Sequence, residues 1–136
     1  MSSSDVSLRW EGRDLVFRGG VPGGPQIHLD SDGADGPSPM RALMLSLAGC
    51  MAIDVKMILD KSRVPVTALA VDVSGTRAEE PPRRFTSLVL TYRIEGPGEE
   101  HEAKLQRAVD LSRDTYCSVL HTLRKDLDLE IRIERV

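Results

Sequence analysis

The chain has 136 residues and a mass of 15.0 kDa, so we expect a single domain spanning 1–136. Its 18 basic and 21 acidic residues give a net charge of −3, which offers no electrostatic reason to expect nucleic acid or an anionic membrane as a partner. No run approaches the roughly 18 apolar residues of a transmembrane helix, and residues 1–5 lack a secretory pattern. We therefore expect a cytoplasmic protein.

The first thirty residues have the pattern of short strands. Apolar and polar residues alternate over 6–10, an extended pattern resumes over 15–18, and a third strand is expected at 26–29. Residues 30–37, which read Asp-Ser-Asp-Gly-Ala-Asp-Gly-Pro, have the composition of a loop. The pattern predicts a group of short strands that a loop separates from the rest of the chain.

A long apolar helix follows this loop. Ser38 and Pro39 are typical of a helix start, and the helix is expected to continue to about Lys61. The twelve residues from Ala42 to Ile53 carry no charge and are apolar around the whole circumference. A helix of that kind has to be buried on all sides. A chain of this length with few strands can hardly wrap it alone, so we expect a second subunit to help cover it.

The second half of the chain alternates between strand and helix patterns. We expect strands at 69–73 and 85–94, then helices at 99–113 and 117–126, and a last strand at 131–133. One face of the first of these helices carries Leu105, Ala108, Val109 and Ser112. The second helix is expected to have its cap near Asp114 or Thr115. This order of elements predicts an α+β fold around a mostly antiparallel sheet.

Two cysteines are too few for a disulfide framework. Cys50 lies in the middle of the apolar helix, where burial raises the pKa of a thiol and the helix dipole gives no help. Asp54, one turn later on the same face, would also oppose a thiolate. Cys117 lies near the expected start of a helix, where a thiol is easier to ionise. The residues alone are compatible with inert core thiols or with a redox pair.

The remaining chemistry-bearing residues form no recognisable site. His28, His101 and His121 are scattered and the cysteines are not in a Cys-x-x-Cys motif, so no zinc site is expected. No local signature supports a nucleophilic triad. The glycines of residues 19–24 lack the strand-to-helix context of a phosphate loop. We expect neither a metal nor an organic cofactor.

Three segments carry a family resemblance. They are Gly36-Pro37-Ser38-Pro39-Met40, Leu47-Ala48-Gly49-Cys50 with Ala52-Ile53-Asp54-Val55 following, and Ala108-Val109-Asp110-Leu111-Ser112 leading to Tyr116-Cys117-Ser118-Val119. From Trp10 to the final strand the chain resembles the OsmC-like family, the relatives of the osmotically inducible protein C and of the organic hydroperoxide resistance proteins. The resemblance implies an intertwined homodimer of α+β fold, with a long buried helix at its centre and active sites at the subunit interface.

The resemblance also implies a reaction. In the peroxidase members, the first cysteine attacks the O–O bond of an organic hydroperoxide, which leaves a sulfenic acid and an alcohol. The second cysteine condenses with it to a disulfide, and an external dithiol reduces that disulfide. Carried over to this chain, Cys50 is the peroxidatic thiol and Cys117 the resolving one.

A buried thiolate needs a compensating cation. The family uses an Arg from the N-terminal strands, for which Arg13 in Gly12-Arg13-Asp14 is the candidate here and Arg18 the alternative. The Glu that holds this Arg in the family is absent, since its region carries Met40 and Arg41. The expected function is a thiol-dependent peroxidase acting on organic hydroperoxides. The alternative is a non-catalytic or redox-sensing protein that binds a small ligand on the same dimeric fold.

Overall fold

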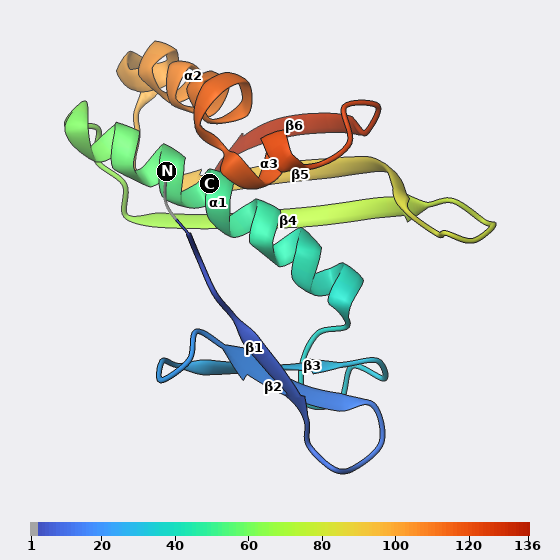
Figure 1. Ribbon diagram of the computed structural model, residues 1–136. Helices are drawn as coiled ribbons and strands as arrows, with labels where there is room; N and C mark the ends of the chain where they lie inside the picture. The colour runs from blue at the N-terminus through green and yellow to red at the C-terminus, as the bar shows by residue number, and fades with distance from the viewer. Residues whose placement is uncertain (1–2) are drawn as a thin grey trace. The chain divides into compact units, whose positions relative to one another are not determined.

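The computed structural model describes residues 3–136, which form two compact units, residues 3–44 and 45–136. The boundary between the units falls inside the longest helix, α1 (Pro39–Lys61). Each unit contains a three-stranded sheet, and the helices of the second unit complete an α+β fold (Figure 1). The predicted fold class is therefore confirmed, whereas a single domain over 1–136 remains a prediction.

The first unit is an antiparallel meander with the strand order β1-β2-β3. Its strands are β1 (Ser7–Trp10), β2 (Val16–Gly20) and β3 (Gln26–Asp30), close to the three predicted segments. The predicted loop follows β3 and leads into α1. At that start the Ser38 hydroxyl accepts a hydrogen bond from the backbone N–H of Arg41 at 3.4 Å, as expected of an N-cap residue.

A buried carboxylate organises the loop after β3. Asp30 is 2% exposed, and its side chain accepts hydrogen bonds from the backbone N–H groups of Asp32, Ala34 and Asp35 at 2.9–3.1 Å. These donors stabilise the charged form and hold the pKa of Asp30 below its ordinary value. The loop is therefore a defined structure, although its composition predicts only a turn-rich segment.

The second unit is built on the sheet β4-β5-β6. Its strands are β4 (Ala68–Arg77), β5 (Phe85–Glu95) and β6 (Asp128–Arg135). The pair β4–β5 is antiparallel, and β5–β6 is parallel because the chain crosses between them through helices. Alternate residues of β5 are buried: Leu88, Leu90, Tyr92 and Ile94. Figure 1 shows the helices of this unit beside one face of the sheet.

The helical segment between β5 and β6 differs from its prediction at its end. It runs through the short turn η1 (Glu99–His101), helix α2 (Glu102–Leu111), the π-helical turn η2 (Ser112–Tyr116) and the short helix α3 (Ser118–Thr122). The residues of the predicted helix face are buried: Leu105, Ala108 and Val109 in α2, and Ser112 at the start of η2. The predicted cap is wrong, because Cys117 precedes α3 in an extended conformation and accepts the capping hydrogen bond itself.

The long helix α1 is buried on one face by its own unit. The buried residues recur at helical spacing: Leu47, Ala48, Met51, Val55 and Leu59. On the opposite face Leu45, Ile53 and Met57 are 62%, 61% and 52% exposed. A single chain therefore covers only part of the apolar circumference, and the second subunit remains a prediction.

The apolar character of α1 also bears on the membrane. Over an 18-residue window its mean hydropathy is 1.9, so by length and composition alone α1 is able to cross a bilayer. The expectation that no segment approaches a membrane span therefore needs correction. One such helix is weak support for a membrane protein, since core helices that pack on a sheet share this composition.

Candidate active site

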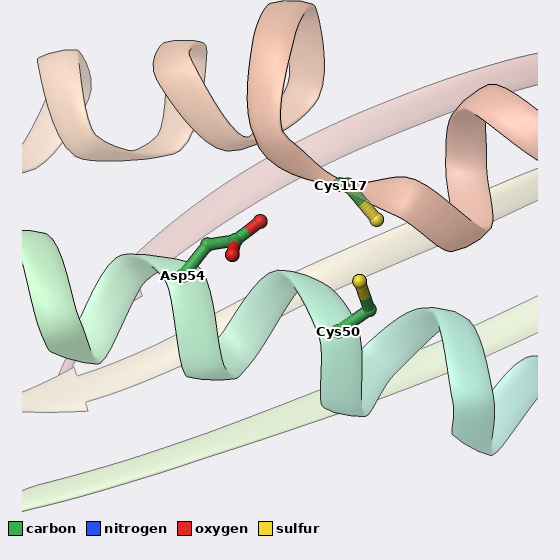
Figure 2. A group of neighbouring side chains, drawn as sticks. All are labelled: Cys50, Asp54 and Cys117. Atoms are coloured by element: carbon green, nitrogen blue, oxygen red, sulfur yellow. The ribbon is translucent and has the colours of Figure 1, made fainter. Parts of the chain in front are cut away.

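The structure brings the two thiols together. The sulfur atoms of Cys50 and Cys117 and a carboxylate oxygen of Asp54 all lie within 4.8 Å of one another. Figure 2 shows the two sulfurs directed toward each other, with the Asp54 carboxylate beside them. Both cysteines are free thiols. A disulfide needs an S–S distance of about 2.05 Å, so the two sulfurs have to move closer before they bond.

Helix α1 supplies two of the three groups. Cys50 and Asp54 are four residues apart, which places both on one face of a helix, one turn from each other. Both lie at the border of the buried stripe and are half-buried. The spacing of the sequence thus fixes the relation of Cys50 to Asp54, as predicted.

The third group comes from the end of the π-helical turn. The backbone N–H of Cys117 donates to the Ser112 carbonyl at 2.9 Å, and the Cys117 sulfur accepts from the Leu120 N–H at 3.4 Å. The extended residue between η2 and α3 is thereby held with its side chain inward, and Cys117 is completely buried. π-Helical turns of this kind occur frequently at functional sites.

Burial controls the ionisation of Cys117. Loss of hydration raises the pKa of this thiol to about 11, the neighbouring Cys50 and Asp54 add to the effect, and the Leu120 N–H opposes it. The prediction that a helix start makes Cys117 easier to ionise is therefore wrong. Helix α3 has only five residues, and its terminus does not offset the burial.

Two further polar side chains surround the thiols, and the sequence analysis did not assign them to the site. The completely buried Ser112 hydroxyl donates to Asp54 Oδ2 at 2.9 Å. The Tyr92 hydroxyl of β5 is buried and has no hydrogen-bond partner among the described residues. Burial raises the pKa of Tyr92, the nearby Ser112 side chain opposes this effect, and Cys117, Asp54 and Cys50 raise the pKa further. A serine on an otherwise apolar helix face was the available sequence signal for Ser112.

The candidate cations belong to the first unit. The Arg13 guanidinium forms an ion pair with Asp35, and this carboxylate raises the pKa of Arg13. Arg18 lies 3.2 Å from a carboxylate oxygen of Glu11. Both arginines therefore have carboxylate partners within their own unit. A role for either of them beside the thiols remains a prediction.

A cleft of about 500 Å³ reaches the carboxylate of the thiol cluster. It combines apolar walls with two cationic side chains, and its lining is Asp54, Met57, Ile58, Lys61, Ser62, Arg107, Leu111 and Tyr116. Because Asp54 belongs both to this cleft and to the thiol cluster, the cluster lies next to space that a small molecule can enter.

The two cysteine sulfurs and the Asp54 carboxylate are also potential metal ligands. Two sulfurs and one carboxylate oxygen offer three donors to a soft cation, whereas a structural zinc site takes four. The expectation that the protein needs no metal or organic cofactor remains a prediction.

This α+β chain places a thiol on its long helix next to a thiol that follows the second helix. The chain belongs to the OsmC-like protein family, whose family model matches residues 31–132. Protein YhfA of Escherichia coli strain K12 is 40% identical over 116 residues, which cover 85% of this chain and 86% of that protein. The resemblance inferred from the cysteine segments is thereby confirmed.

Solved structures share the fold over almost the whole length. A hypothetical protein from Aquifex aeolicus VF5 superposes with a TM-score of 0.86 at 28% identity, covering 100% of this chain and 98% of that chain. The organic hydroperoxide resistance protein OhrB of Bacillus subtilis superposes with a TM-score of 0.64 at 14% identity, covering 98% of each chain. At the latter identity the likeness concerns the fold alone.

Proposed function

We propose that this protein is a thiol-dependent peroxidase that reduces organic hydroperoxides through a reversible Cys50–Cys117 disulfide. The observation that carries the proposal is the approach of the two free sulfurs to within 4.8 Å. Membership of a family whose members include organic hydroperoxide resistance proteins supports peroxide-related redox chemistry. The enzymatic activity itself belongs to the proposal.

In the first step Cys50 is the attacking thiol. It is half-buried and therefore more accessible than the completely buried Cys117. Its thiolate attacks the terminal oxygen of the hydroperoxide, so that an S–O bond forms and the O–O bond breaks. The products are an alcohol and the sulfenic acid of Cys50. Arg13 is the proposed cation that stabilises the thiolate, with Arg18 as the alternative.

In the second step Cys117 resolves the intermediate. Its sulfur attacks the sulfenic sulfur of Cys50, a disulfide forms and water leaves. An external dithiol then reduces the disulfide and returns both thiols. This cycle requires no metal or organic cofactor.

The proposal includes a homodimer in the cytoplasm. The exposed face of α1 and the start of β4 line an apolar groove of about 670 Å³ in the second unit. A Cβ atom built at Gly49, which lines this groove, meets nothing within 4 Å, so its own chain leaves this space open. A second copy that covers the groove would complete the burial of the helix.

Two serine variants test the assignment of the thiols. Cys50→Ser is expected to abolish consumption of cumene hydroperoxide in the presence of dithiothreitol, because the attacking sulfur is gone. Cys117→Ser is expected to complete one turnover and then stall, leaving the Cys50 sulfenic acid open to further oxidation to the sulfinic acid. Peroxide consumption and the mass of the protein are measured together. Full turnover by Cys50→Ser would refute the proposal.

The second candidate function is a non-catalytic or redox-sensing protein that binds a small ligand. It is favoured by one observation, namely that the thiol cluster contains the Asp54 carboxylate, which opposes a thiolate. The rate of alkylation against pH, measured on Cys117→Ser, distinguishes the two. A thiol activated for attack reacts with a midpoint well below the free-thiol value of about 8.5. A midpoint at or above that value favours the binding protein.

A further inference from the structure

In the resolving step the thiol of Cys117 has to lose its proton. Cys117 is completely buried, and loss of hydration raises the pKa of its thiol to about 11. At neutral pH this sulfur therefore carries its proton, but the thiolate is the form that attacks another sulfur. A group inside the cluster has to accept the proton as the S–S bond forms.

Asp54 is placed to be that group. One of its carboxylate oxygens lies within 4.8 Å of both sulfurs, which is within reach of a small side-chain rotation or of one bridging water. Figure 2 shows the carboxylate beside the gap between the two sulfurs. The other nearby polar groups are the hydroxyls of Ser112 and Tyr92, and the raised pKa of Tyr92 keeps its hydroxyl protonated, so that it does not take up the Cys117 proton.

Ser112 prepares Asp54 for this role. Its hydroxyl donates to Asp54 Oδ2 at 2.9 Å and so fixes the carboxylate on the η2 side of the cluster. No hydrogen bond to Asp54 Oδ1 is found among the described residues, which leaves this oxygen available to the thiols. Oδ2 of Asp54 therefore fixes the position of the carboxylate, and Oδ1 is the oxygen that is open to a proton from the thiols.

We propose that Asp54 is the acid–base group of the resolving step, positioned by Ser112. This inference rests on the proposed peroxidase function. The Cys117 proton passes to the Asp54 carboxylate as the Cys117 sulfur bonds to the sulfenic sulfur of Cys50. The S–O bond of the sulfenic acid breaks, and Asp54 returns the same proton to the departing hydroxide, which leaves as water. No electron donor or acceptor beyond the two sulfurs takes part in this step.

This role gives the Asp54 carboxylate a function beside the two thiols. The negative charge of Asp54 helps to raise the pKa of the neighbouring Cys117 thiol. In the second step the same charge is an advantage, because general acid–base catalysis contributes about 10²–10⁴-fold to a proton-coupled reaction.

The test separates the two steps in the full-length protein. Asp54→Asn keeps the shape of the side chain and removes its basicity. With tert-butyl hydroperoxide in a single turnover, Cys50 sulfenic acid is expected to form at the parental rate or faster. Its condensation to the disulfide is expected to be about 100-fold slower, so that the sulfenic acid accumulates. The two rates are read by trapping the sulfenic acid with dimedone and by mass spectrometry of the quenched protein.

A matched control comes from the same helix. Asp60→Asn removes a carboxylate that pairs with Lys56 at 2.6 Å on the exposed side of α1, and both steps are expected to keep the parental rates. Ser112→Ala is expected to slow the condensation less than Asp54→Asn does, because it displaces the carboxylate without removing it. Circular dichroism verifies that each variant is folded.

A second experiment forms the disulfide with diamide and does not depend on hydroperoxide activity. Diamide oxidises a dithiol to a disulfide through an adduct on the first thiol, which the second thiol then displaces. If the parent does not react with hydroperoxide, the proposed function fails, and the diamide reaction still decides the role of Asp54. Asp54→Asn is expected to slow closure of the disulfide about 100-fold here too. Closure at the parental rate, or no Cys50–Cys117 disulfide in the parent, would overturn the inference.

Discussion

The same residue type has two different environments in the thiol cluster. Cys50 is half-buried on α1, whereas Cys117 is completely buried and its sulfur accepts a backbone N–H. This difference supports different roles for the two thiols, in which the accessible Cys50 sulfur reacts with the substrate and the buried Cys117 sulfur reacts only with Cys50. Ser112, Tyr92 and Asp54 surround the pair with polar groups in an otherwise apolar core.

The raised pKa of Cys117 predicts an alkaline loss of stability. A folded-state pKa of about 11, above the ordinary value of 9.0, means that the unfolded chain ionises first. The contribution of Cys117 is therefore present below about pH 9 and is lost as the pH rises toward 11. Urea unfolding of the reduced protein at pH 8 and pH 10.5 is expected to show an additional loss on the order of 2 kcal/mol relative to Cys117→Ala. Equal losses in the two proteins would contradict this.

At the scale of elements, two irregular segments with a fixed shape lie where regular structure ends. Cys117 lies between a π-helical turn and a one-turn helix, and the loop of residues 30–37 follows the edge of a sheet. In each case a side chain inside the segment satisfies backbone N–H groups, namely the Cys117 sulfur and the Asp30 carboxylate. These contacts give irregular segments a fixed shape.

The lowered pKa of Asp30 predicts that the loop of residues 30–37 loses stability in acid. Asp30→Asn replaces the carboxylate that accepts these backbone hydrogen bonds with a neutral amide, so at pH 7 the free energy of unfolding is expected to fall. Because the folded pKa of Asp30 is lowered, its contribution is present above the ordinary pKa of about 3.9 and is lost as the pH falls through the folded value. The difference between parent and variant in urea unfolding therefore shrinks in acid.

Asp32→Asn is the control for this experiment. Asp32 is exposed and contributes its backbone N–H rather than its side chain to the loop, so its variant is expected to match the parent at both pH values. An Asp30→Asn variant as stable as the parent at pH 7 would show that the carboxylate does not organise the loop.

At the scale of the whole molecule, the apolar face of α1 remains open. Leu45, Ile53 and Met57 are exposed, and the groove they line continues onto β4. An exposed patch of this kind on a chain with 29% charged residues is typical of a subunit interface. The homodimer implied by the sequence resemblance is therefore predicted to use this face of the second unit as its interface.

Ile53→Asp tests the homodimer. Burying an unpaired carboxylate in an apolar interface costs several kcal/mol, so the variant is expected to elute as a monomer while the parent is a dimer. Light scattering after size-exclusion chromatography measures the mass of each. Val136→Asp changes an equally exposed apolar residue at the chain end and is expected to remain dimeric. A monomeric parent, or a dimeric Ile53→Asp, would count against the interface.

Much of the fold was predictable because its signals are local. Helix α1 begins at Pro39 and ends at Lys61, as the cap and the apolar run predict, and the alternation in β5 marks its buried residues. The end of α2 was not predictable in this way, since the π-helical turn and the cap at Cys117 depend on burial against other elements. The ionisation of Cys117 was misjudged for the same reason.

The sequence by itself determined the family, the helix that carries Cys50 and Asp54, and the pairing of their side chains on one helix face, because spacing along a helix fixes relative direction. Only the tertiary structure decided that Cys117 lies near Cys50, that Ser112 holds Asp54 and that the Tyr92 hydroxyl is buried near them. These contacts join segments far apart along the chain. Their distances depend on how the helices pack on the sheet, and no local pattern records that packing.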